Sequence, residues 1–410
     1  MSFLPLFGGQ QQANDQKTIS KCNNVALLMS GIDEDMSLIL SMEKNAEDKG
    51  NEENIEYNQV NKNDPDIEND INSISHYYEL VGYRLARIKS LLYHEVTRYN
   101  ANNQNPNDCP AFLSSLVADI VTTHPDIIPK LLSQIPSPNM PFEAKKDISA
   151  IFNSLMIRTY LTCDVPNSSN SNTSSDQTKQ PQNNNRFAEY ILDTYDSILT
   201  PIMRGHGEGT PDSALHCGSM LRSTLRHNIL YNKLLTSNYV YPLLDTYVHV
   251  PNFDVASDAL ETVRDIFLMN RTIASQFLAR EYTTVFPRYN KMLQSQNYIT
   301  RRMSLKLLGE ILLDKTNFGV MMKYISSPEN LAIIMMLLSD PSGNIQFEAF
   351  HVFKIFVANP GKPENVVRIL TKNKVKLVKY LEQFHADRES EDDQFRDEKR
   401  LILSTLNGLE

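Results

Sequence analysis

The residues that could support acid–base or metal chemistry are scattered along this chain. His216 and His227 are eleven positions apart, and no carboxylate accompanies them at the spacing of a metal-ligand set. Asp254 and Asp258 are four positions apart, and such a pair on a surface helix is usually only solvated charge. We therefore interpret His216 and His227 as polar surface histidines, and Asp254 as the cap of the apolar-periodic helix that follows it.

A run of acidic residues at 64–68 resembles the start of a calcium loop but lacks the rest of it. An EF-hand needs Gly at its sixth position and a bidentate Glu at its twelfth. Counted from Asp64, those positions hold Asn69 and Ser75. The motifs GxxxxGK[ST], GxGxxG, HExxH and GxSxG are also absent. The sequence thus predicts a protein that is not an enzyme and holds no metal or cofactor.

Charge and cysteine content limit the protein class. A net charge of −9 and a pI of about 5.6 argue against a nucleic-acid binder, which usually carries a basic face. The four cysteines form no CxxC pair and are best interpreted as reduced thiols of a cytosolic protein. The N-terminus lacks the features of a signal peptide, and no apolar stretch is long enough to span a membrane.

The second half of the chain repeats a pattern of one small and two large apolar residues at i, i+4 and i+8. The small residues are 42, 45 and 45 positions apart. The four triplets are Cys217-Leu221-Leu225, Ala259-Val263-Phe267, Ser304-Leu308-Leu312 and Ala349-Phe353-Val357. A second series follows them at Leu235, Leu278, Ile325 and Leu370. A period in the forties with two or three helices per unit is typical of armadillo or HEAT repeats.

An earlier repeat is expected around residues 143–160, where Ile148, Phe152 and Met156 occupy the three key positions. The interval from Ile148 to Cys217 is 69 residues, but residues 164–186 form a Ser/Asn/Gln tract of the kind found in disordered loops. Without those 23 residues the interval is about 46, close to the others. We therefore interpret the tract as an insert within one repeat.

These patterns predict an all-α, right-handed, armadillo/HEAT-like solenoid as a single domain over residues 17–400. Residues 1–16 are expected to be a flexible N-terminus, and residues 401–410 a C-terminal tail. The acidic, Asn-rich stretch at about 44–72 is expected to be a second disordered insert. The charged stretch 385–400 is expected to be a polar capping helix, which the end of a solenoid needs.

Three features favour protein binding. Met is abundant in residues 333–338, where one exposed Met could serve hydrophobic recognition. Phe residues spaced three apart in 344–359 predict a core stripe. Polar side chains expected on the concave wall could bind a partner's carboxylates, or be ordinary solvated residues. They are Arg222, Arg226, Asp258, Arg264, Arg301, Arg302, Asn344 and His351.

A basic stretch at 371–380 has two interpretations. Its lysines could meet a phosphate or an anionic membrane. We favour the alternative, a helix of the last repeat whose lysines extend over its own apolar face. They are Lys372, Lys374, Lys376 and Lys379.

Long segments of the chain resemble one known family of scaffold proteins. They are NYITRRMSLKLLGEILLDKTNFGVMMKYISSPENL (297–331), GNIQFEAFHVFKIFVANPGKPENV (343–366), FDVASDALETVRDIF (253–267) and DDQFRDEKR (392–400). This is the mouse protein 25, or calcium-binding protein 39, family. The resemblance is dense over 186–400 and traceable over 111–160. The Asn-rich inserts suggest a member of its fungal, Hym-type branch.

The resemblance implies a non-catalytic armadillo-like scaffold. It implies partners among protein kinases and pseudokinases of the sterile-twenty class, held in their active conformation against the concave wall. In fungi it implies a setting in polarised growth, morphogenesis and cell separation, with a downstream nuclear-Dbf-related kinase. The implied localisation is cytoplasmic, concentrated at sites of polarised growth or division. The family's calcium label finds no support in these residues.

The resemblance also implies site residues. Phe253 and Arg302 match kinase-contacting residues of the concave wall. Lys315, Phe318 and Met335 match a pocket for a Trp-Glu-Phe-like motif in the partner's tail.

Two positions of the implied pocket depart from the family's pattern. Lys315 stands where animal members have Arg, which removes a planar bidentate donor. Ala332 replaces a Lys in the same pocket, which predicts a different tail motif.

Three other classes of function were considered. A generic armadillo adaptor for unrelated cargo would usually carry a ladder of Trp and Asn on its groove, and this chain has no Trp. An enzyme with an unrecognised site would need a cluster of His or carboxylates. An RNA-binding repeat protein would need a basic groove with stacking aromatics.

The interpretation of residues 164–186 as an insert can be tested by deletion. Removing them should change the free energy of unfolding by less than about 1 kcal/mol, because a long surface loop costs little closure entropy. Thermal unfolding followed by circular dichroism measures this. Loss of the cooperative transition would show that the tract is a structured part of its repeat.

Overall fold

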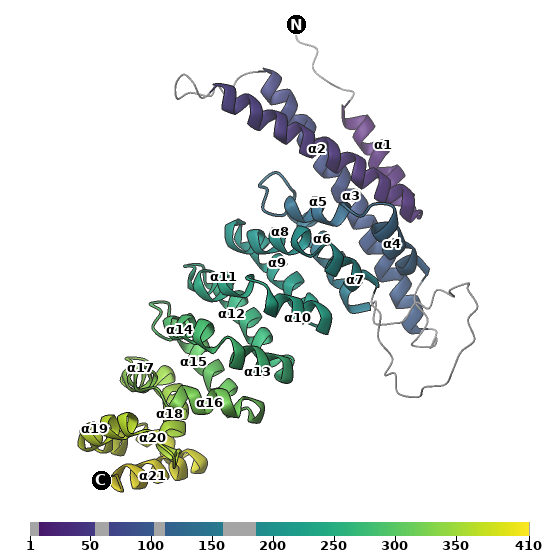
Figure 1. The fold of residues 1–410 in the computed structure, drawn as a ribbon. Coiled ribbons are helices and arrows are strands. Elements are labelled where there is room, and N and C mark those ends of the chain that lie inside the picture. Colours follow the sequence, from purple (N-terminus) through teal and green to yellow (C-terminus); the bar gives the residue numbers. More distant parts are fainter. Residues whose placement is uncertain (1–7, 54–64, 102–110, 159–185, 410) are drawn as a thin grey trace, which may run out of the picture. The chain divides into compact units, whose positions relative to one another are not determined.

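The computed structural model describes residues 8–53, 65–101, 111–158 and 186–409. In these residues the chain forms helices and turns with no β-strand, which confirms the predicted all-α helical-repeat class (Figure 1). Contacts divide it into two compact units, residues 1–233 and residues 234–410, here called the N-terminal and C-terminal units. A single domain over 17–400 therefore stays a prediction.

The N-terminal unit is built on three helices that pack side by side. These are α3, α6 and α9, and α3 packs on α6 as α6 packs on α9. The other helices cover them. The elements are α1 (Gly8–Lys21), α2 (Val25–Glu53), α3 (Pro65–Ala101), α4 (Ala111–Thr122), α5 (Ile127–Ser133), α6 (Phe142–Arg158), α7 (Arg186–Asp193), α8 (Tyr195–Glu208) and α9 (Pro211–Thr224); α10 (Asn228–Thr236) spans the division.

The C-terminal unit repeats the arrangement with α12, α15, α18 and α21, each packed on the next (Figure 1). Shorter helices precede α12, α15 and α18, whereas α21 follows the longer α19 and the short α20. The elements are α11 (Val240–Asp245), η1 (Tyr247–His249), α12 (Phe253–Leu268), α13 (Arg271–Arg280), α14 (Tyr282–Leu293), α15 (Tyr298–Leu313), η2 (Lys315–Asn317), α16 (Phe318–Ile325), α17 (Pro328–Leu338), α18 (Gly343–Ala358), α19 (Glu364–Gln383), α20 (Ala386–Glu389) and α21 (Asp393–Asn407).

The small residues of the repeat are buried at one fixed position in the third helix. Cys217, Ala259, Ser304 and Ala349 are all fully buried. Each lies seven residues after the N-cap of its helix, and the caps are Thr210, Asn252, Asn297 and Ser342. The large residues at i+4 and i+8 are buried as well, so the sequence pattern marks the core of each repeat.

The small side chain is needed because the second and third helices of a repeat lie close together. A Cβ on Gly205 of α8 would lie 2.5 Å from the Sγ of Cys217 in α9. In α14, the Tyr289 hydroxyl donates to the Ser304 carbonyl of α15 at 2.7 Å. A large residue at this position would force the helices apart, and overpacking of a core is destabilising.

Two helices depart from this rule. In α6 the equivalent position, seven residues after Pro141, holds the large, buried Ile148. In α21 the residue seven positions after the N-cap Asp392 is Lys399, which is buried. Its Nζ donates to the carbonyls of Glu382 (3.2 Å) and Phe384 (3.0 Å) and pairs with the Glu389 carboxylate (2.6 Å). The helix that precedes α21 here is α20, which is only four residues long.

Several predicted boundaries are wrong. Helix α1 begins at Gly8, within the expected flexible N-terminus. Helix α2 extends to Glu53 and helix α3 begins at Pro65, so the described residues of the expected insert at 44–72 are helical. The predicted tail at 401–410 belongs to α21 as far as Asn407. The predicted insert at 164–186 lies outside the described residues except for Arg186, which begins α7.

The expected capping helix at 385–400 is also different. It is divided between α20 and α21, and α21 buries an apolar stripe rather than being polar throughout. The buried residues include Phe395, Ile402 and Leu406.

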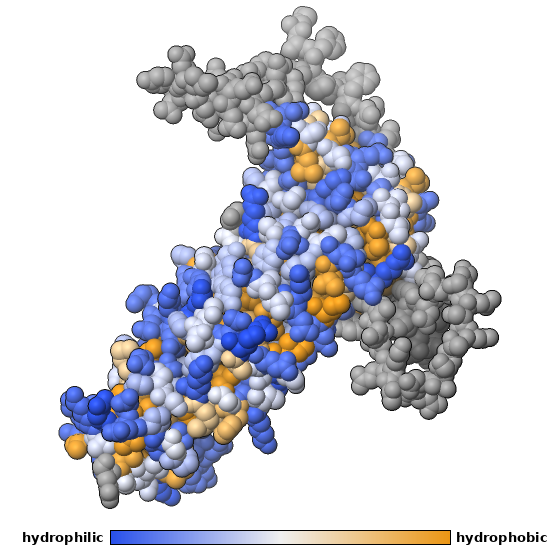
Figure 2. Space-filling view, viewed as in Figure 1, coloured by the Kyte–Doolittle hydropathy of each residue, from blue (hydrophilic) through white to orange (hydrophobic). Residues whose placement is uncertain are grey.

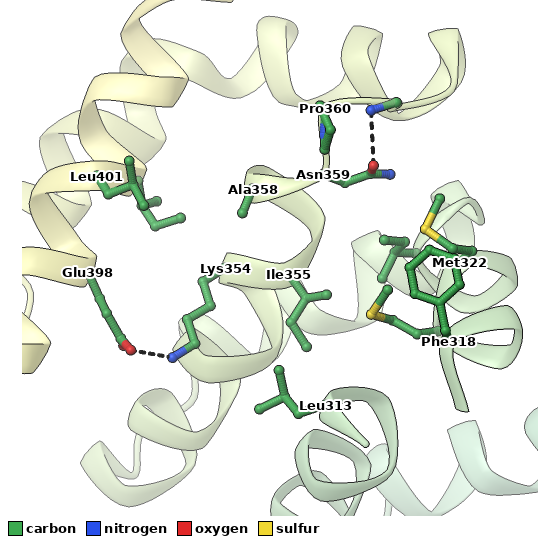
Figure 3. A pocket seen from close by; sticks show the side chains of 14 residues that line it. Leu313, Phe318, Met322, Lys354, Ile355, Ala358, Asn359, Pro360, Glu398 and Leu401 are labelled. Atoms are coloured by element: carbon green, nitrogen blue, oxygen red, sulfur yellow. Dashed lines mark hydrogen bonds and ion pairs between the residues drawn. The ribbon is translucent and has the colours of Figure 1, made fainter. Parts of the chain in front are cut away.

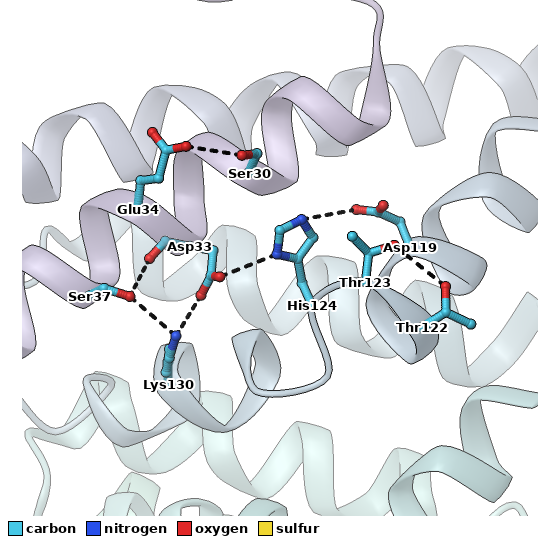
Figure 4. A network of polar contacts seen from close by, with 9 residues as sticks. All are labelled: Ser30, Asp33, Glu34, Ser37, Asp119, Thr122, Thr123, His124 and Lys130. Carbon is cyan, nitrogen blue, oxygen red and sulfur yellow. Dashed lines mark hydrogen bonds and ion pairs between the residues drawn. The ribbon is translucent and has the colours of Figure 1, made fainter.

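A polar network ties α2 to the α4–α5 region of the N-terminal unit (Figure 4). The Asp33 carboxylate accepts a hydrogen bond from Lys130 Nζ at 2.6 Å and contacts His124 Nδ1 at 3.2 Å. The opposite ring nitrogen of His124 lies 3.9 Å from the Asp119 carboxylate. Burial would raise the pKa of Asp33, but the bonds from Lys130 and His124 outweigh it and lower that pKa. The network therefore favours an ionised Asp33.

The helix at 253–268 begins one residue before Asp254, the residue that was expected to cap it. Asn252, not Asp254, is the N-cap, and its side-chain oxygen accepts from the Val255 backbone N–H at 3.0 Å. Asp254 lies in the first turn. An N-cap must precede the first helical residue to reach an orphan N–H, which Asp254 does not.

This correction predicts unequal effects of two alanine substitutions. Asn252→Ala should reduce the free energy of unfolding by about 1 kcal/mol, because it removes the cap. Asp254→Ala, the matched control, should cost less than about 0.5 kcal/mol through the helix dipole. Urea unfolding measures both. A larger loss for Asp254→Ala would contradict the assignment.

Candidate partner-binding site

An apolar cavity of about 660 Å³ opens on the C-terminal unit, between α15, α16, α18 and α21 (Figure 3). Three of its lining side chains are large, apolar and mostly exposed: Leu313 (59%), Phe318 (63%) and Leu401 (61%). Exposed apolar surface of this kind commonly marks a binding site. The lining is completed by Met321, Met322, Ile325, Lys354, Ile355, Ala358, Asn359, Pro360, Gly361, Glu398 and Ile402.

A capped turn positions two of these side chains. Asp314 ends α15 directly after Leu313, and its carboxylate accepts bonds from the Thr316 backbone N–H (2.9 Å) and hydroxyl (2.7 Å). These bonds, more than the nearby Arg271, hold the pKa of Asp314 below its usual value. The turn leads into α16 at Phe318. The ionised carboxylate thus fixes the chain between two residues that line the cavity.

One ion pair contributes charge to the cavity wall. Lys354 Nζ of α18 lies 2.7 Å from the Glu398 carboxylate of α21 (Figure 3). The second carboxylate oxygen lies 3.8 Å from His351 Nδ1. Burial would raise the pKa of Glu398, but hydrogen bonds from Lys354 and Gln394 outweigh it and lower that pKa. The pair therefore fastens α21 to α18 on this side of the cavity.

An amide donor at the cavity is left without a partner. Asn359 is buried, and its side-chain oxygen accepts from the Gly361 backbone N–H at 3.0 Å. Its Nδ2 makes no hydrogen bond with any described residue. A buried donor left unpaired is costly, but this Nδ2 is itself covered by the protein and does not face the open cavity. The cavity can thus receive an apolar side chain.

A charged cleft adjoins this cavity at Leu313, which lines both. In the cleft, Arg264 pairs with Glu310 at 3.3 Å and Arg271 with Asp314 at 3.0 Å. The surface therefore changes from apolar to ionic on crossing Leu313.

Only one of the three residues expected in a tail pocket lines the cavity. Phe318 does so, as the first residue of α16. Lys315 is exposed in the preceding turn, η2, and is not part of the lining. Met335 is half-buried on α17 and is not part of it either. Its neighbour Met336 is 59% exposed, which supplies the exposed Met expected in this helix.

The two expected kinase-contacting residues lie near the starts of adjacent helices. Phe253 is the first residue of α12 and is 59% exposed. Arg302, half-buried, is the fifth residue of α15, which packs on α12.

The sequence analysis did not identify a second aromatic residue that, like Phe253, is the first residue of its helix. Tyr298 is the first residue of α15 and is partly exposed, as Phe253 is in α12. Hydrogen bonds with Asn344 and Ser342 of the next repeat lower its pKa. Its place 45 residues after Phe253, one repeat later, could have indicated it.

Two of the arginines expected to be available for partner carboxylates already have partners within the chain. Arg264 pairs with Glu310 and lies 3.8 Å from Glu261. Arg301 pairs with Asp340 at 3.2 Å and is mostly buried. The guanidinium groups of both arginines are therefore at least partly neutralised by carboxylates of the chain itself.

The histidine interpretation is also wrong in part. His227 is buried, and its Nε2 is hydrogen-bonded to the Met156 carbonyl at 2.9 Å. Burial lowers its pKa, which favours the neutral ring. His227 is thus a core residue rather than a surface one.

The described residues contain neither a cluster of metal-binding side chains nor a membrane-spanning helix. In that part of the chain, no group of three or more His, Cys, Asp or Glu side chains could hold a metal ion. No helix among them is long and apolar enough to cross a membrane.

The family model described as Mo25-like matches residues 47–410, nearly the whole chain. The chain belongs to the Mo25-like family. It is 42% identical over 268 residues to a human protein named calcium-binding protein 39-like, covering 65% of this chain and 72% of the relative. The Mo25-like protein of Schizosaccharomyces pombe is 39% identical over 272 residues, covering 66% and 75%.

A filamentous fungus supplies a further Mo25-like relative. The conidiophore development protein hymA of Emericella nidulans is 33% identical over 297 residues, covering 66% of this chain and 71% of the relative. The family match confirms the resemblance drawn from the sequence, including the Hym-type relatives. The chain is thus a helical-repeat scaffold of the Mo25-like family.

Proposed function

We propose that this chain is a non-catalytic scaffold that binds a protein kinase or pseudokinase of the sterile-twenty class and holds it in its active conformation. The observation that carries the proposal is the apolar cavity of the C-terminal unit, open to solvent and bordered by Phe318, in a member of the Mo25-like family. A scaffold that binds the active state more tightly than the inactive one shifts the population by its differential affinity. Such a role needs no catalytic residues.

The cavity and the N-terminal ends of α12 and α15 would make two separate contacts with the kinase. The cavity would take an aromatic residue of a Trp-Glu-Phe-like tail motif, with Lys315, Phe318 and Met335 around the tail. Phe253 and Arg302 would contact the kinase domain itself.

The cellular role we propose is signalling in polarised growth, morphogenesis and cell separation, with a nuclear-Dbf-related kinase downstream. A relative named for conidiophore development supports this setting. We propose a cytoplasmic location, concentrated at sites of growth or division. The alternative is an armadillo adaptor for unrelated protein cargo, which the same cavity could also serve.

The tail contact can be tested by fluorescence because the chain contains no Trp. A peptide ending in Trp-acidic-Phe should show a saturable blue shift of its Trp emission when the protein is added. Phe318→Ala should weaken binding by about tenfold or more, because it removes an exposed aromatic from the cavity wall. Met335→Ala should weaken it as well, with helicity preserved.

Ile229→Ala is the control, since it removes a half-exposed apolar side chain from the N-terminal unit. Its affinity should equal that of the native protein. Equal affinities for all four proteins would exclude this cavity as the tail site, and no blue shift at all would favour the adaptor alternative.

A second test separates the two contacts. Phe253→Ala and Arg302→Ala should reduce kinase activation at least about tenfold while leaving the affinity for the tail peptide within about twofold. Kinase assays and peptide titrations on the same preparations measure the two effects. Equal losses in both would mean that the two surfaces are not separate.

A further inference from the structure

Helix α19 has a solvent face made of four cations and one apolar residue. Its core side is marked by Val366, Leu370, Leu377 and Leu381, which are buried. On the opposite side of the helix, by the 100° rotation per residue, lie the residues of what is here called the basic face. These are Arg368, Lys372, Val375, Lys376 and Lys379, all exposed.

The charge of the basic face is balanced only at its two ends, where the exposed Glu364 and Glu382 lie four residues before Arg368 and three residues after Lys379. No Asp or Glu occurs between Glu364 and Glu382, the residues near the two ends of α19. Among the described residues, none of the four cations makes an ion pair, and the only hydrogen bond from their side chains runs from Arg368 to Asn365. This concentration of positive charge stands on a chain whose net charge is −9.

The structure revises the interpretation of these lysines as covering their own helix's apolar face. Only Lys374 turns back, and its Nζ donates to the carbonyls of Asn407 (2.9 Å) and Leu409 (2.8 Å). Lys372, Lys376 and Lys379 extend away from the core. Val375, in their midst, is 80% exposed, the highest value among the large apolar side chains of the described residues.

We propose that the basic face of α19 binds the anionic headgroups of a membrane surface. The face is a single exposed helix without a groove, and it runs about 17 Å from Arg368 to Lys379 at 1.5 Å per residue. Three of its four cations are lysines, compact point charges that suit a diffuse anionic layer rather than one bidentate partner. The surface over α19 is strongly hydrophilic in Figure 2.

Val375 distinguishes a membrane from a purely ionic partner. At the centre of the basic face, its side chain can enter the headgroup layer while the surrounding lysines contact phosphates and carboxylates. An acidic protein surface would gain nothing from an exposed valine unless it offered a matching apolar pocket. The binding is peripheral and reversible, since no residue of the face enters the hydrocarbon core. It does not depend on the proposed kinase partner.

Vesicle sedimentation tests this proposal on the full chain. The protein should bind vesicles of phosphatidylcholine with 30% phosphatidylserine, about tenfold or more above pure phosphatidylcholine, and the binding should fall steeply with salt. The variant Lys372→Glu/Lys376→Glu/Lys379→Glu should lose about two orders of magnitude in partition coefficient. Val375→Asp should weaken the binding with the lysines intact.

The control variant is Lys21→Glu/Lys291→Glu/Arg400→Glu, which changes the net charge equally at exposed positions elsewhere. It should bind phosphatidylserine vesicles within about threefold of the native protein. An equal loss in the control would mean that net charge alone drives binding. No binding of the native protein to these vesicles would overturn the proposal, and binding to soluble poly-glutamate in its place would assign the face to an acidic protein. Circular dichroism of each variant checks folding.

Discussion

The close approach of the second and third helices within a repeat constrains much of this structure. In α9, α12, α15 and α18 a small, buried side chain lies seven residues after the N-cap. The large residues at i+4 and i+8 lie on the same face of the helix and are buried as well. The remaining faces of the third helices are left free, and these carry Phe253, Tyr298 and Arg302.

The sequence predicted the parts of the fold that depend on this local spacing. The small-large-large pattern located α9, α12, α15 and α18, and the apolar i, i+4, i+8 spacing of Ile148, Phe152 and Met156 located α6, because these patterns lie within one helix. It could not predict the end of the array, where Lys399 takes the small position, because a lysine is tolerated there only through carbonyls and a carboxylate supplied by α19 and α20. The helix ends at Gly8, Glu53 and Pro65 were missed because polar composition alone does not stop a helix.

The candidate site was predictable to a smaller extent for a related reason. Its lining comes from four helices and one turn, and only Phe318 was identified from the resemblance. Leu401 and Leu313 look like ordinary core residues of their helices, and only the three-dimensional packing leaves them exposed. In the same way, the ion pairs of Arg264 and Arg301 join residues about 40 positions apart, so composition could not separate them from free cations.

Leu313 lines both the apolar cavity and the charged cleft, and this affects the chain direction in which a peptide can bind there. On one side of it, a bound chain would meet methionine, isoleucine and leucine; on the other, it would meet the paired charges of Arg264, Glu310, Arg271 and Asp314. A peptide segment with an apolar end and a charged end fits this boundary in one orientation and not in the reverse. The groove therefore has a direction, set by a single leucine at the end of α15.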